Sequence, residues 1–582
     1  MARVAALLLL LCPLAAPAPS PAAQARLLPP RGFNPCNGLQ CNMGLLGEAA
    51  LLALAESLVS TGLAAANYTW FNLDDGIVSH RDAVTQQLVA DTAAFPSGTL
   101  KPLAAAVGAL GLSLGAYTDR GDRTCEGRPG AQGFEAQDAA TWASWGVRWL
   151  KEDSCSSSGD FAVAAQQYGA MAAGLRATGE DVFFSLCGWF SGFAAFSALS
   201  PTIGDAWRVG TDVPNFERFI QNVEAAEAAA AFSGPLRGWP DIDMIGGHWP
   251  AQQETLHLAF TALIGAPLLL SWNITDPGAS TLPLSAYLNP ELLALHSDDP
   301  APAVATRGRY YSRLAGGAVT GSASARYPGL PLDTATPCAD ARAAFAFTPA
   351  APGSATGALA SAAAPGLCLG AWDLWAGACI DALAVQLVPC GSTANGCDAR
   401  AQQWTHNASS RLLASALDWG GGTPRPGPYL SHVGAVPGAL YLQSAAAAPP
   451  PPPAAAPPLA QAWQWLPLPG GNGSSVALQG ADGQCLGSPL GGNSASGANV
   501  WARWLANGDV ALLLFNAGLT PADALCDAAC LSAALGGGHA QWRARDVWRR
   551  ADAGVVTVAE GVRAAGLAAQ GGTLLLRLTP LQ

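Results

Sequence analysis

Between residues 30 and 300 the chain alternates short apolar runs with longer helical segments, and this alternation constrains the fold most strongly. The expected strands are residues 66–73, 112–117, 147–150, 182–186, 206–209, 239–244 and 267–272. The expected helices between them are residues 97–110, 135–145, 160–177, 216–231 and 254–263. Repeated strand-then-helix units indicate a parallel sheet. About 270 residues in roughly eight units fit a closed (β/α)8 TIM barrel better than an open doubly wound sheet. No Gly-x-Gly-x-x-Gly motif follows the first strand, which disfavours a dinucleotide fold.

Beyond residue 300 the helical period fades. Residues 338–490 hold six cysteines and an Ala/Pro run at 445–458, and strand-like runs return at 510–515, 554–558 and 573–578. An Ala/Pro run is typical of an extended loop and not of a core element. We therefore expect a barrel over residues 26–300 and the start of a C-terminal β domain at 301–337. An insertion at 338–490 would precede the rest of an antiparallel β-sandwich at 499–582.

The first 25 residues have the features of a secretory signal peptide. Arg3 precedes an apolar run at residues 4–11 that is too short to span a bilayer, and Ala23-Gln24-Ala25 is a small-x-small cleavage site. No later stretch looks apolar enough to span a membrane. The sequence therefore predicts a secreted protein, or one delivered to a vacuole or lysosome through the secretory pathway.

Cysteine count and charge narrow the class of protein further. The chain has 14 cysteines, and removal of Cys12 with the leader leaves an odd number, so most should pair and at least one should stay free. Four Asn-x-Ser/Thr sequons, which fit a glycoprotein, begin at Asn67, Asn273, Asn407 and Asn472. The formal net charge of −12 would repel a phosphate backbone, so no nucleic-acid partner is expected. The sequence carries no signal for an oligomeric state.

Several of the expected barrel strands end in carboxylates. These acids are Asp74, Asp75, Asp119, Asp153, Asp212, Asp241 and Asp243. In a (β/α)8 barrel the C-terminal strand ends form the mouth of the active site. A ring of acids there repels itself, and it persists only if cations, hydrogen bonds or a ligand compensate.

Two of these acids have a basic residue close by. Lys151 and Asp153 lie two apart on one strand, so both can point into the mouth, and the ammonium would keep Asp153 ionised as a nucleophile. Asp212, with Arg208 at a different strand end, would act as acid and then as base. Two carboxylates that face each other across a mouth fit glycoside hydrolysis, which needs no metal or organic cofactor.

The other candidates at this mouth each have an alternative interpretation. Tyr117, Trp189 and Trp239 are expected to stack on a sugar, although a single tryptophan is more often part of a core. A strand-end aspartate often caps the next helix, and a lone lysine such as Lys151 is often a surface residue. A ring of acids could also bind Mg²⁺ or Ca²⁺. Zinc is disfavoured because the histidines show no ligand spacing with a cysteine.

A series of motifs resembles the secreted α-galactosidase and α-N-acetylgalactosaminidase family, glycoside hydrolase family 27. The resemblance covers about residues 31–300 and 499–580. The motifs, in order, are Leu73-Asp74-Asp75, Arg81-Asp82, Phe95-Pro96-Ser97-Gly98, Gly115-Ala116-Tyr117-Thr118-Asp119, Thr124-Cys125, Leu150-Lys151-Glu152-Asp153-Ser154-Cys155, Trp239-Pro240-Asp241-Ile242-Asp243-Met244, Gly508-Asp509-Val510 and Arg545-Asp546-Val547-Trp548.

The resemblance implies retaining hydrolysis of terminal α-linked galactose from oligosaccharides or glycoconjugates through a covalent glycosyl-aspartate. It assigns the nucleophile to Asp153 and the acid/base to Asp212. It also implies a disulfide between Cys125 and Cys155. The substrate contacts that it implies are Asp74, Asp75, Tyr117, Lys151, Cys187, Trp189, Arg208, Asp243 and Met244.

Three departures from the family pattern bear on specificity. Cys36 stands where the family has a stacking tryptophan, and Gly76 stands where Cys41 would find its usual partner, so we expect a substitute Cys36–Cys41 bridge. Gly188 replaces a glutamate that helps to select a 2-hydroxyl, which leaves the C2 substituent open. The alternatives are therefore an α-N-acetylgalactosaminidase, or a carbohydrate-binding barrel with weakened catalysis.

The insertion has a signature of its own. It resembles ricin-type β-trefoil lectin repeats in the segments Gly366-Leu367-Cys368-Leu369-Gly370, Val385-Gln386-Leu387-Val388-Pro389-Cys390, Gln402-Gln403-Trp404, Gln461-Ala462-Trp463 and Gln484-Cys485-Leu486-Gly487. In such lobes the Gln-x-Trp pattern packs a hydrophobic core. A purely structural role and sugar binding both stay open, because no polar sugar-binding residues can be placed.

Overall fold

The structure is a computed structural model. It describes residues 20–157, 161–188, 193–230, 232–276, 278–298, 311–315, 333–336, 338–363, 365–372, 384–391, 402–407, 412–416, 429–433, 440–443, 459–460, 463–468, 475–480, 483–487, 497–536 and 538–581.

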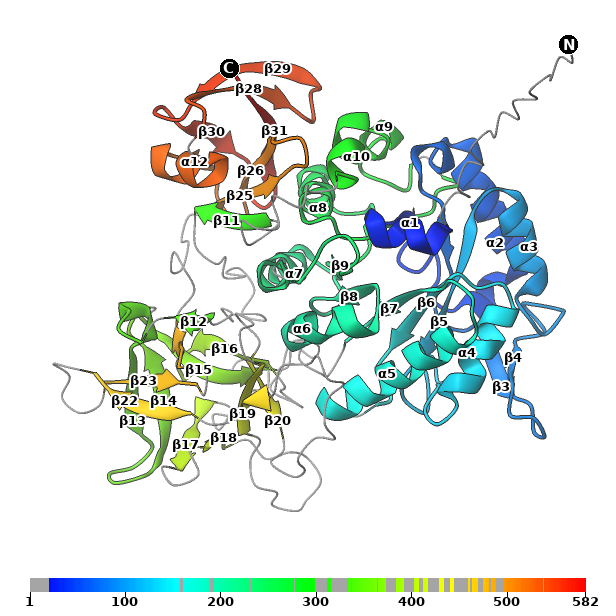
Figure 1. The fold of residues 1–582 in the computed structure, drawn as a ribbon, viewed down its shortest axis with the longest axis horizontal. Coiled ribbons are helices and arrows are strands. Elements are labelled where there is room, and N and C mark those ends of the chain that lie inside the picture. The colour runs from blue at the N-terminus through cyan, green and yellow to red at the C-terminus, as the bar shows by residue number, and fades with distance from the viewer. Residues whose placement is uncertain are drawn as a thin grey trace, which may run out of the picture.

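Eight parallel strands form one closed sheet (Figure 1). Their order is β10-β1-β2-β5-β6-β7-β8-β9, with bounds β1 Arg31–Phe33, β2 Trp70–Asn72, β5 Ser113–Asp119, β6 Trp149–Asp153, β7 Phe183–Leu186, β8 Ala206–Arg208, β9 Trp239–Asp241 and β10 Leu268–Leu270. The ladder closes where Ile245, just after β9, pairs in parallel with Leu270 of β10. The expected (β/α)8 barrel is thus confirmed.

Helices surround this sheet. They are α1 Pro21–Leu27, α2 Met43–Ser60, α3 Lys101–Ala109, α4 Glu135–Ser144, α5 Phe161–Ala177, α6 Phe193–Ile203, α7 Phe216–Ala229, α8 Ala251–Ile264, α9 Leu284–Tyr287 and α10 Pro290–His296, with a short hairpin of β3 Val78–Arg81 and β4 Leu88–Ala90. In α7 the Asn215 side chain caps the helix by accepting from the backbone N–H of Arg218. Phe216, Phe219 and Val223 follow at helical spacing and are buried, so this face packs on the barrel.

Among the described helices, α2 alone is long and apolar enough, by length and composition, to cross a membrane. We expected no such segment after the leader. Leu51, Leu54 and Leu58 bury one face of α2 in the barrel core, whereas Leu45 and Val59 are exposed. The buried face therefore serves as the packing surface of the first barrel helix.

The interior of the barrel is filled by aromatic side chains that begin the strands. Trp70 of β2, Trp149 of β6 and Phe183 of β7 are buried together, with ring centroids 5.3 Å apart for Trp70–Trp149 and 4.2 Å apart for Trp149–Phe183. Because these residues start their strands, they lie toward the N-terminal end of the barrel. We call this set, with Trp239 of β9, the aromatic layer.

The C-terminal domain is a six-stranded antiparallel sheet. Its order is β11-β25-β26-β31-β28-β29, with bounds β11 Tyr311–Ala315, β25 Ala498–Trp504, β26 Val510–Asn516, β31 Gly572–Pro580, β28 Gln541–Asp546 and β29 Ala551–Thr557. The paired strands β27 Ala522–Cys526 and β30 Val562–Leu567, with α12 Ala528–Leu535, share a core with one face of this sheet. Along β26, Leu512 and Leu514 join that core while Leu513 and Phe515 join the barrel core, as the two-residue period of a strand requires.

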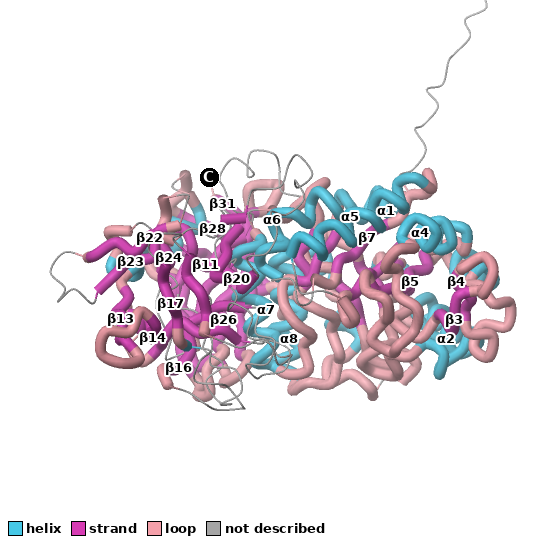
Figure 2. Tube along the Cα trace, turned by 90° about the horizontal axis from the view of Figure 1, so that it is seen from below, coloured by secondary structure: helices cyan, strands magenta, loops and turns pink. Residues whose placement is uncertain are grey.

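A separate 13-stranded β unit interrupts the C-terminal domain between β11 and β25. Its strands are β12 Asp333–Thr336, β13 Phe345–Pro349, β14 Thr356–Ser361, β15 Leu367–Trp372, β16 Ala384–Pro389, β17 Trp404–Asn407, β18 Leu412–Ser415, β19 Tyr429–Val433, β20 Leu440–Gln443, β21 Leu459–Ala460, β22 Gln464–Pro467, β23 Ser475–Gln479 and β24 Cys485–Gly487. Figure 2 shows the strand-rich units at one end of the elongated molecule and the helix-lined barrel at the other.

Candidate active site

Lys151 joins acids from two different strand ends. Its Nζ lies 3.3 Å from Asp74 Oδ2, which follows β2, and 3.8 Å from Asp153 Oδ2 at the end of β6. Burial works against the ammonium, but Asp74 and Asp153 outweigh it and raise the pKa of Lys151 well above its ordinary value. Lys151 therefore stays charged and offsets the repulsion between the two carboxylates.

Asp153 is held by donors on both of its carboxyl oxygens. The Tyr117 hydroxyl donates to Oδ2 at 2.9 Å, and the backbone N–H of Ser154 donates to Oδ1 at 2.8 Å. Burial, and then Asp153, raise the pKa of Tyr117 well above its ordinary value, so the phenol keeps its proton. The Asp153 carboxylate is thus fixed in place with two hydrogen bonds and one cation.

Asp74 and Asp75 are also positioned by neighbours from other loops. Asn34, just after β1, donates its side-chain amide to Asp74 Oδ2 at 2.8 Å. The backbone N–H groups of Gly76 and Glu126 donate to the two oxygens of Asp75 at 2.6 and 2.8 Å. Burial raises the pKa of Asp75, and these two hydrogen bonds oppose that rise.

Arg208, the last residue of β8, forms a second cationic bridge. Its guanidinium lies 3.1 Å from Asp212 Oδ1 and 3.2 Å from Asp243 Oδ2. Asp243 also accepts from the backbone N–H groups of Val213 and Met244, both at 2.8 Å. The φ of Asp243 is +86°, a strained value for a residue with a side chain. These hydrogen bonds and the ion pair hold the Asp243 carboxylate next to the Arg208 guanidinium.

Asp212 is the most accessible of these acids, with 44% of its side chain exposed. Partial burial raises the pKa of Asp212 above its ordinary value; Arg208 opposes this rise, and Asp243 and Asp153 add to it. The two bridges lie at the C-terminal ends of β6 and β8, which only β7 separates in the sheet, so both lie at the same mouth of the barrel. A raised pKa favours the protonated form that a general acid needs.

Cys187 lies at the end of β7 and is the one free cysteine among the described residues. It is buried, and burial raises the pKa of its thiol well above the ordinary value, so the side chain is neutral. Its charged neighbours include Asp153, Arg208 and Lys151. Trp189 lies outside the described residues.

Trp239 does not lie at the mouth, and the expectation that it stacks on a sugar is wrong. It is the first residue of β9, fully buried in the aromatic layer at the opposite end of the barrel. Met244, by contrast, follows the end of β9 and is a partly buried residue that packs against that layer. Met244 therefore contacts both Asp243, through its backbone N–H, and the aromatic layer, through its side chain.

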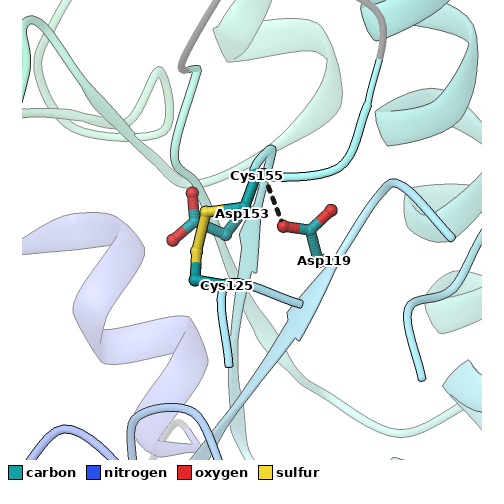
Figure 3. A group of neighbouring side chains, drawn as sticks. All are labelled: Asp119, Cys125, Asp153 and Cys155. Atoms are coloured by element: carbon teal, nitrogen blue, oxygen red, sulfur yellow. Dashed lines mark hydrogen bonds between the residues drawn. A yellow bond between two sulfur atoms is a disulfide. The ribbon is translucent and has the colours of Figure 1, made fainter. Parts of the chain in front are cut away.

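The Cys125–Cys155 disulfide is present beside Asp153 (Figure 3). The fully buried Asp119 anchors the same region, because it accepts from the backbone N–H groups of Gly121 at 2.7 Å and Cys155 at 2.6 Å. Burial, and then Asp153, raise the pKa of Asp119 to about 7. The sequence marked Asp119 as a strand-end acid but did not predict this anchoring role. The sulfurs of this cluster are tied up in the bridge and are not free as metal ligands.

The expected substitute bridge between Cys36 and Cys41 is also present. Gly76, where the family has the usual partner of Cys41, has a φ of +82°. A Cβ at Gly76 would lie 2.1 Å from Oδ1 of Asn42, so a side chain there would be strained and would require Asn42 to move. Both cysteines of this bridge thus lie in the loop after β1, and the loop is not linked to the Asp74–Gly76 segment by a disulfide.

Comparison with known proteins decides the family. A family model described as alpha galactosidase A matches residues 37–285, and one described as alpha galactosidase C-terminal beta sandwich domain matches residues 495–578. A probable alpha-galactosidase from Dictyostelium discoideum is 34% identical over 276 residues, which is 47% of this chain and 69% of that protein. The chain belongs to the α-galactosidase family, glycoside hydrolase family 27.

Two further relatives agree with this assignment. The alpha-galactosidase of Cyamopsis tetragonoloba is 36% identical over 275 residues, which is 46% of this chain and 64% of that protein. The structure of the alpha-galactosidase from Saccharomyces cerevisiae with raffinose has a TM-score of 0.57 and 16% identity, and covers 97% of this chain and 100% of that one. The structural likeness supports the family fold, and the sequence relationship supports glycosidase activity.

Proposed function

We propose that this member of the α-galactosidase family removes terminal α-linked galactose from oligosaccharides or glycoconjugates with retention of configuration. The observation that carries the proposal is the pair of cationic bridges at the barrel mouth. Lys151 joins Asp74 to Asp153, and Arg208 joins Asp212 to Asp243. One bridge holds the nucleophile beside the Lys151 ammonium, and the other holds an acid whose pKa is raised.

In the first step, a carboxylate oxygen of Asp153 attacks the anomeric carbon as the bond to the leaving oxygen breaks. Asp212, protonated because of its raised pKa, gives its proton to that oxygen. The product of this step is a glycosyl ester of Asp153 and a free alcohol. The negative pocket stabilises the positive charge that develops on the sugar ring in the transition state.

In the second step, the Asp212 carboxylate takes a proton from water, and the water oxygen bonds to the anomeric carbon. The ester bond to Asp153 breaks, and its carboxylate returns to the donors from Tyr117 and Ser154. Asp212 is again protonated, so both residues end in their starting states.

The remaining predicted contacts are proposed to hold the sugar. Asp74 and Asp75 keep acceptor capacity toward the hydroxyls of the galactose, while Lys151 and Arg208 donate. Cys187 and Met244 supply neutral surface at the walls of the pocket. Because the acids are already held by backbone and side-chain donors, little rearrangement is needed when the sugar binds.

The experiment is hydrolysis of p-nitrophenyl α-D-galactoside by the wild type and by Asp153→Asn. We expect the variant to lose at least about 10⁴-fold in kcat, as removal of a nucleophile does, while its unfolding temperature is unchanged. Asp122→Asn, an exposed acid in the loop after β5, is the matched control. NMR of the first-formed sugar should show the α-anomer. Retained activity in Asp153→Asn, or a β-anomer product, would refute the assignment.

Gly188 favours a second substrate for the same site. With no side chain after Cys187, the structure leaves no glutamate there to select a 2-hydroxyl. Paired assays with p-nitrophenyl α-D-galactoside and its α-N-acetylgalactosaminide distinguish the two, and the larger kcat/KM names the substrate. Sugar binding with no hydrolysis of either compound would instead indicate a carbohydrate-binding barrel that has lost catalysis.

For the insertion, we propose a β-trefoil of the ricin-lectin type. Three hairpins, β13–β14, β17–β18 and β22–β23, recur along it, and each begins at or just after a buried aromatic residue: Phe345, Trp404 and Trp463. The indoles of Trp404 and Trp463 donate to the backbone carbonyls of Leu369 and Leu430, which is the same contact repeated in two successive units. Retention on immobilised galactose by a variant that carries both Asp153→Asn and Asp74→Asn, and so also lacks a proposed sugar contact of the barrel, tests whether the unit binds carbohydrate.

A further inference from the structure

The N-terminal helix α1 closes the lower end of the barrel, opposite the candidate active site. Its exposure alternates with helical spacing: Ala22 and Ala25 are buried, whereas Pro21 and Gln24 are exposed. The two buried alanines pack with the aromatic layer, in which Trp70, Trp149, Phe183 and Trp239 are at most 2% exposed. The helix therefore shields these aromatic rings from water.

Specific hydrogen bonds fix α1 in this place. The indole N–H of Trp239 donates to the backbone carbonyl of Ala25 at 2.7 Å, and the backbone N–H of Leu236 donates to the carbonyl of Arg26 at 2.8 Å. Ser20 caps the helix by accepting from the backbone N–H of Ala23, and Pro21 follows at the first helical position. These are features of a folded helix end.

An ion-pair network ties the same helix to two barrel loops. Arg26 pairs with Asp181, just before β7, and with Asp205 Oδ1 at 2.6 Å, just before β8. Asp181 also accepts from Ser20 and Ala23. Burial works against the Arg26 charge, but the two aspartates outweigh it and raise its pKa.

These contacts bear on where the leader is removed. Cleavage after Ala25, at the small-x-small site Ala23-Gln24-Ala25, would leave Arg26 but remove the cap, both buried alanines and the carbonyl that Trp239 uses. It would open the aromatic layer to solvent, and Met244, which follows β9 at the site, packs against the same layer. Ala15, Ala16 and Ala18 leave room for cleavage further upstream.

We infer that residues 20–28 stay in the mature protein as the lower closure of the barrel, and that processing occurs before Ser20. The inference rests on the packing of α1 and is independent of the proposed substrate. The N-terminal segment is thus a structural part of the enzyme.

The direct test is N-terminal sequencing and intact mass of the protein secreted by a eukaryotic host from its own full-length chain. A first residue at or before Ser20 is expected. A first residue anywhere after Ser20, Arg26 above all, would overturn the inference.

A second test measures the packing itself, on protein expressed from Ser20 onward without a leader so that processing plays no part. Ala25→Glu places a charge against the aromatic layer and should lower Tm by about 5 °C or more, because a buried unpaired carboxylate is strongly destabilising. Gln24→Glu, one residue earlier on the exposed face, should leave Tm unchanged. Equal Tm values for the two variants would show that α1 does not close the barrel.

Discussion

A buried glutamate beneath the barrel mouth should make the stability of the protein fall as pH rises. Glu254 of α8 is fully buried, and its Oε1 accepts from the backbone N–H of Gly247 at 2.8 Å. Burial raises the pKa of Glu254 from 4.5 to about 7, and the backbone amides of Gly247 and Trp249 partly oppose this rise. The folded state thus holds a proton that the unfolded state releases at lower pH.

The sign and size of the effect follow from linkage. Below a pH of about 4.5, Glu254 is protonated in both the folded and the unfolded state, and its burial costs no charge. As pH rises toward and through about 7, the unfolded state loses this proton first, and the free energy of unfolding falls. A shift of about 2.5 pKa units corresponds to about 3 kcal/mol, of which about 2–3 kcal/mol falls between pH 5 and pH 8. Glu254→Gln keeps an oxygen for Gly247 and cannot ionise, so this variant should lack that part of the pH dependence.

The assay is urea unfolding of wild type and Glu254→Gln at pH 5 and pH 8, followed by tryptophan fluorescence. The free energy of unfolding of the wild type should fall by about 2–3 kcal/mol more than that of the variant over this interval. Glu56→Gln, on the exposed side of α2, should behave as the wild type. If wild type and Glu254→Gln lose the same free energy of unfolding, the reasoning is refuted.

Three further predictions concern the site. Because Asp212 must be protonated in the first step, kcat/KM should fall about tenfold per pH unit once the pH exceeds the raised pKa of this carboxyl. Asp212→Asn should remove this fall with an activated aryl galactoside. Asp119→Asn should lower kcat about tenfold or more and leave KM unchanged, because Asp119 positions the chain beside the nucleophile through Cys155. Replacing Cys36 and Cys41 together by serine should lower the free energy of unfolding by about 2 kcal/mol, the value for a short disulfide loop.

Each of these has a result that contradicts it. An alkaline limb that persists in Asp212→Asn would assign it to another group. For Asp119, the exposed Asp122→Asn serves as control, and a change in KM alone would exclude a positioning role. For the bridge, an unchanged urea midpoint in the double serine variant would show that the loop after β1 is held by its other contacts.

The sequence located most of the barrel strands because short apolar runs alternate with longer helical segments. Strands β5 to β10 lie within a few residues of the expected segments. Strand β1 was missed because Arg31-Gly32-Phe33 has no apolar run; Gly32 is needed there, since a Cβ would lie 2.4 Å from the backbone oxygen of Trp70. Helix α2 was missed because its apolar residues continue around most of its surface, and only its packing in the barrel defines a buried face.

The position of a residue at the start or the end of its strand explains which site residues the sequence predicted correctly. Acids at strand ends meet at one mouth whatever their separation along the chain, so Asp74, Asp153 and Asp212 were found. Trp239 was placed wrongly because it starts its strand, and the start of a strand faces the other end of the barrel. The anchoring role of Asp119 depends on the backbone of a neighbouring loop, which no local pattern reveals.

The pairing of β11 with β25 has a consequence for how this protein could have arisen. Ala315 lies opposite Val500 in the ladder, so the chain departs from the sheet and returns to it at adjacent points. A whole extra module therefore occupies the position of an ordinary reversal between neighbouring strands. Such a junction lets the appended module be acquired, exchanged or shed during evolution while the hydrolytic barrel keeps its architecture.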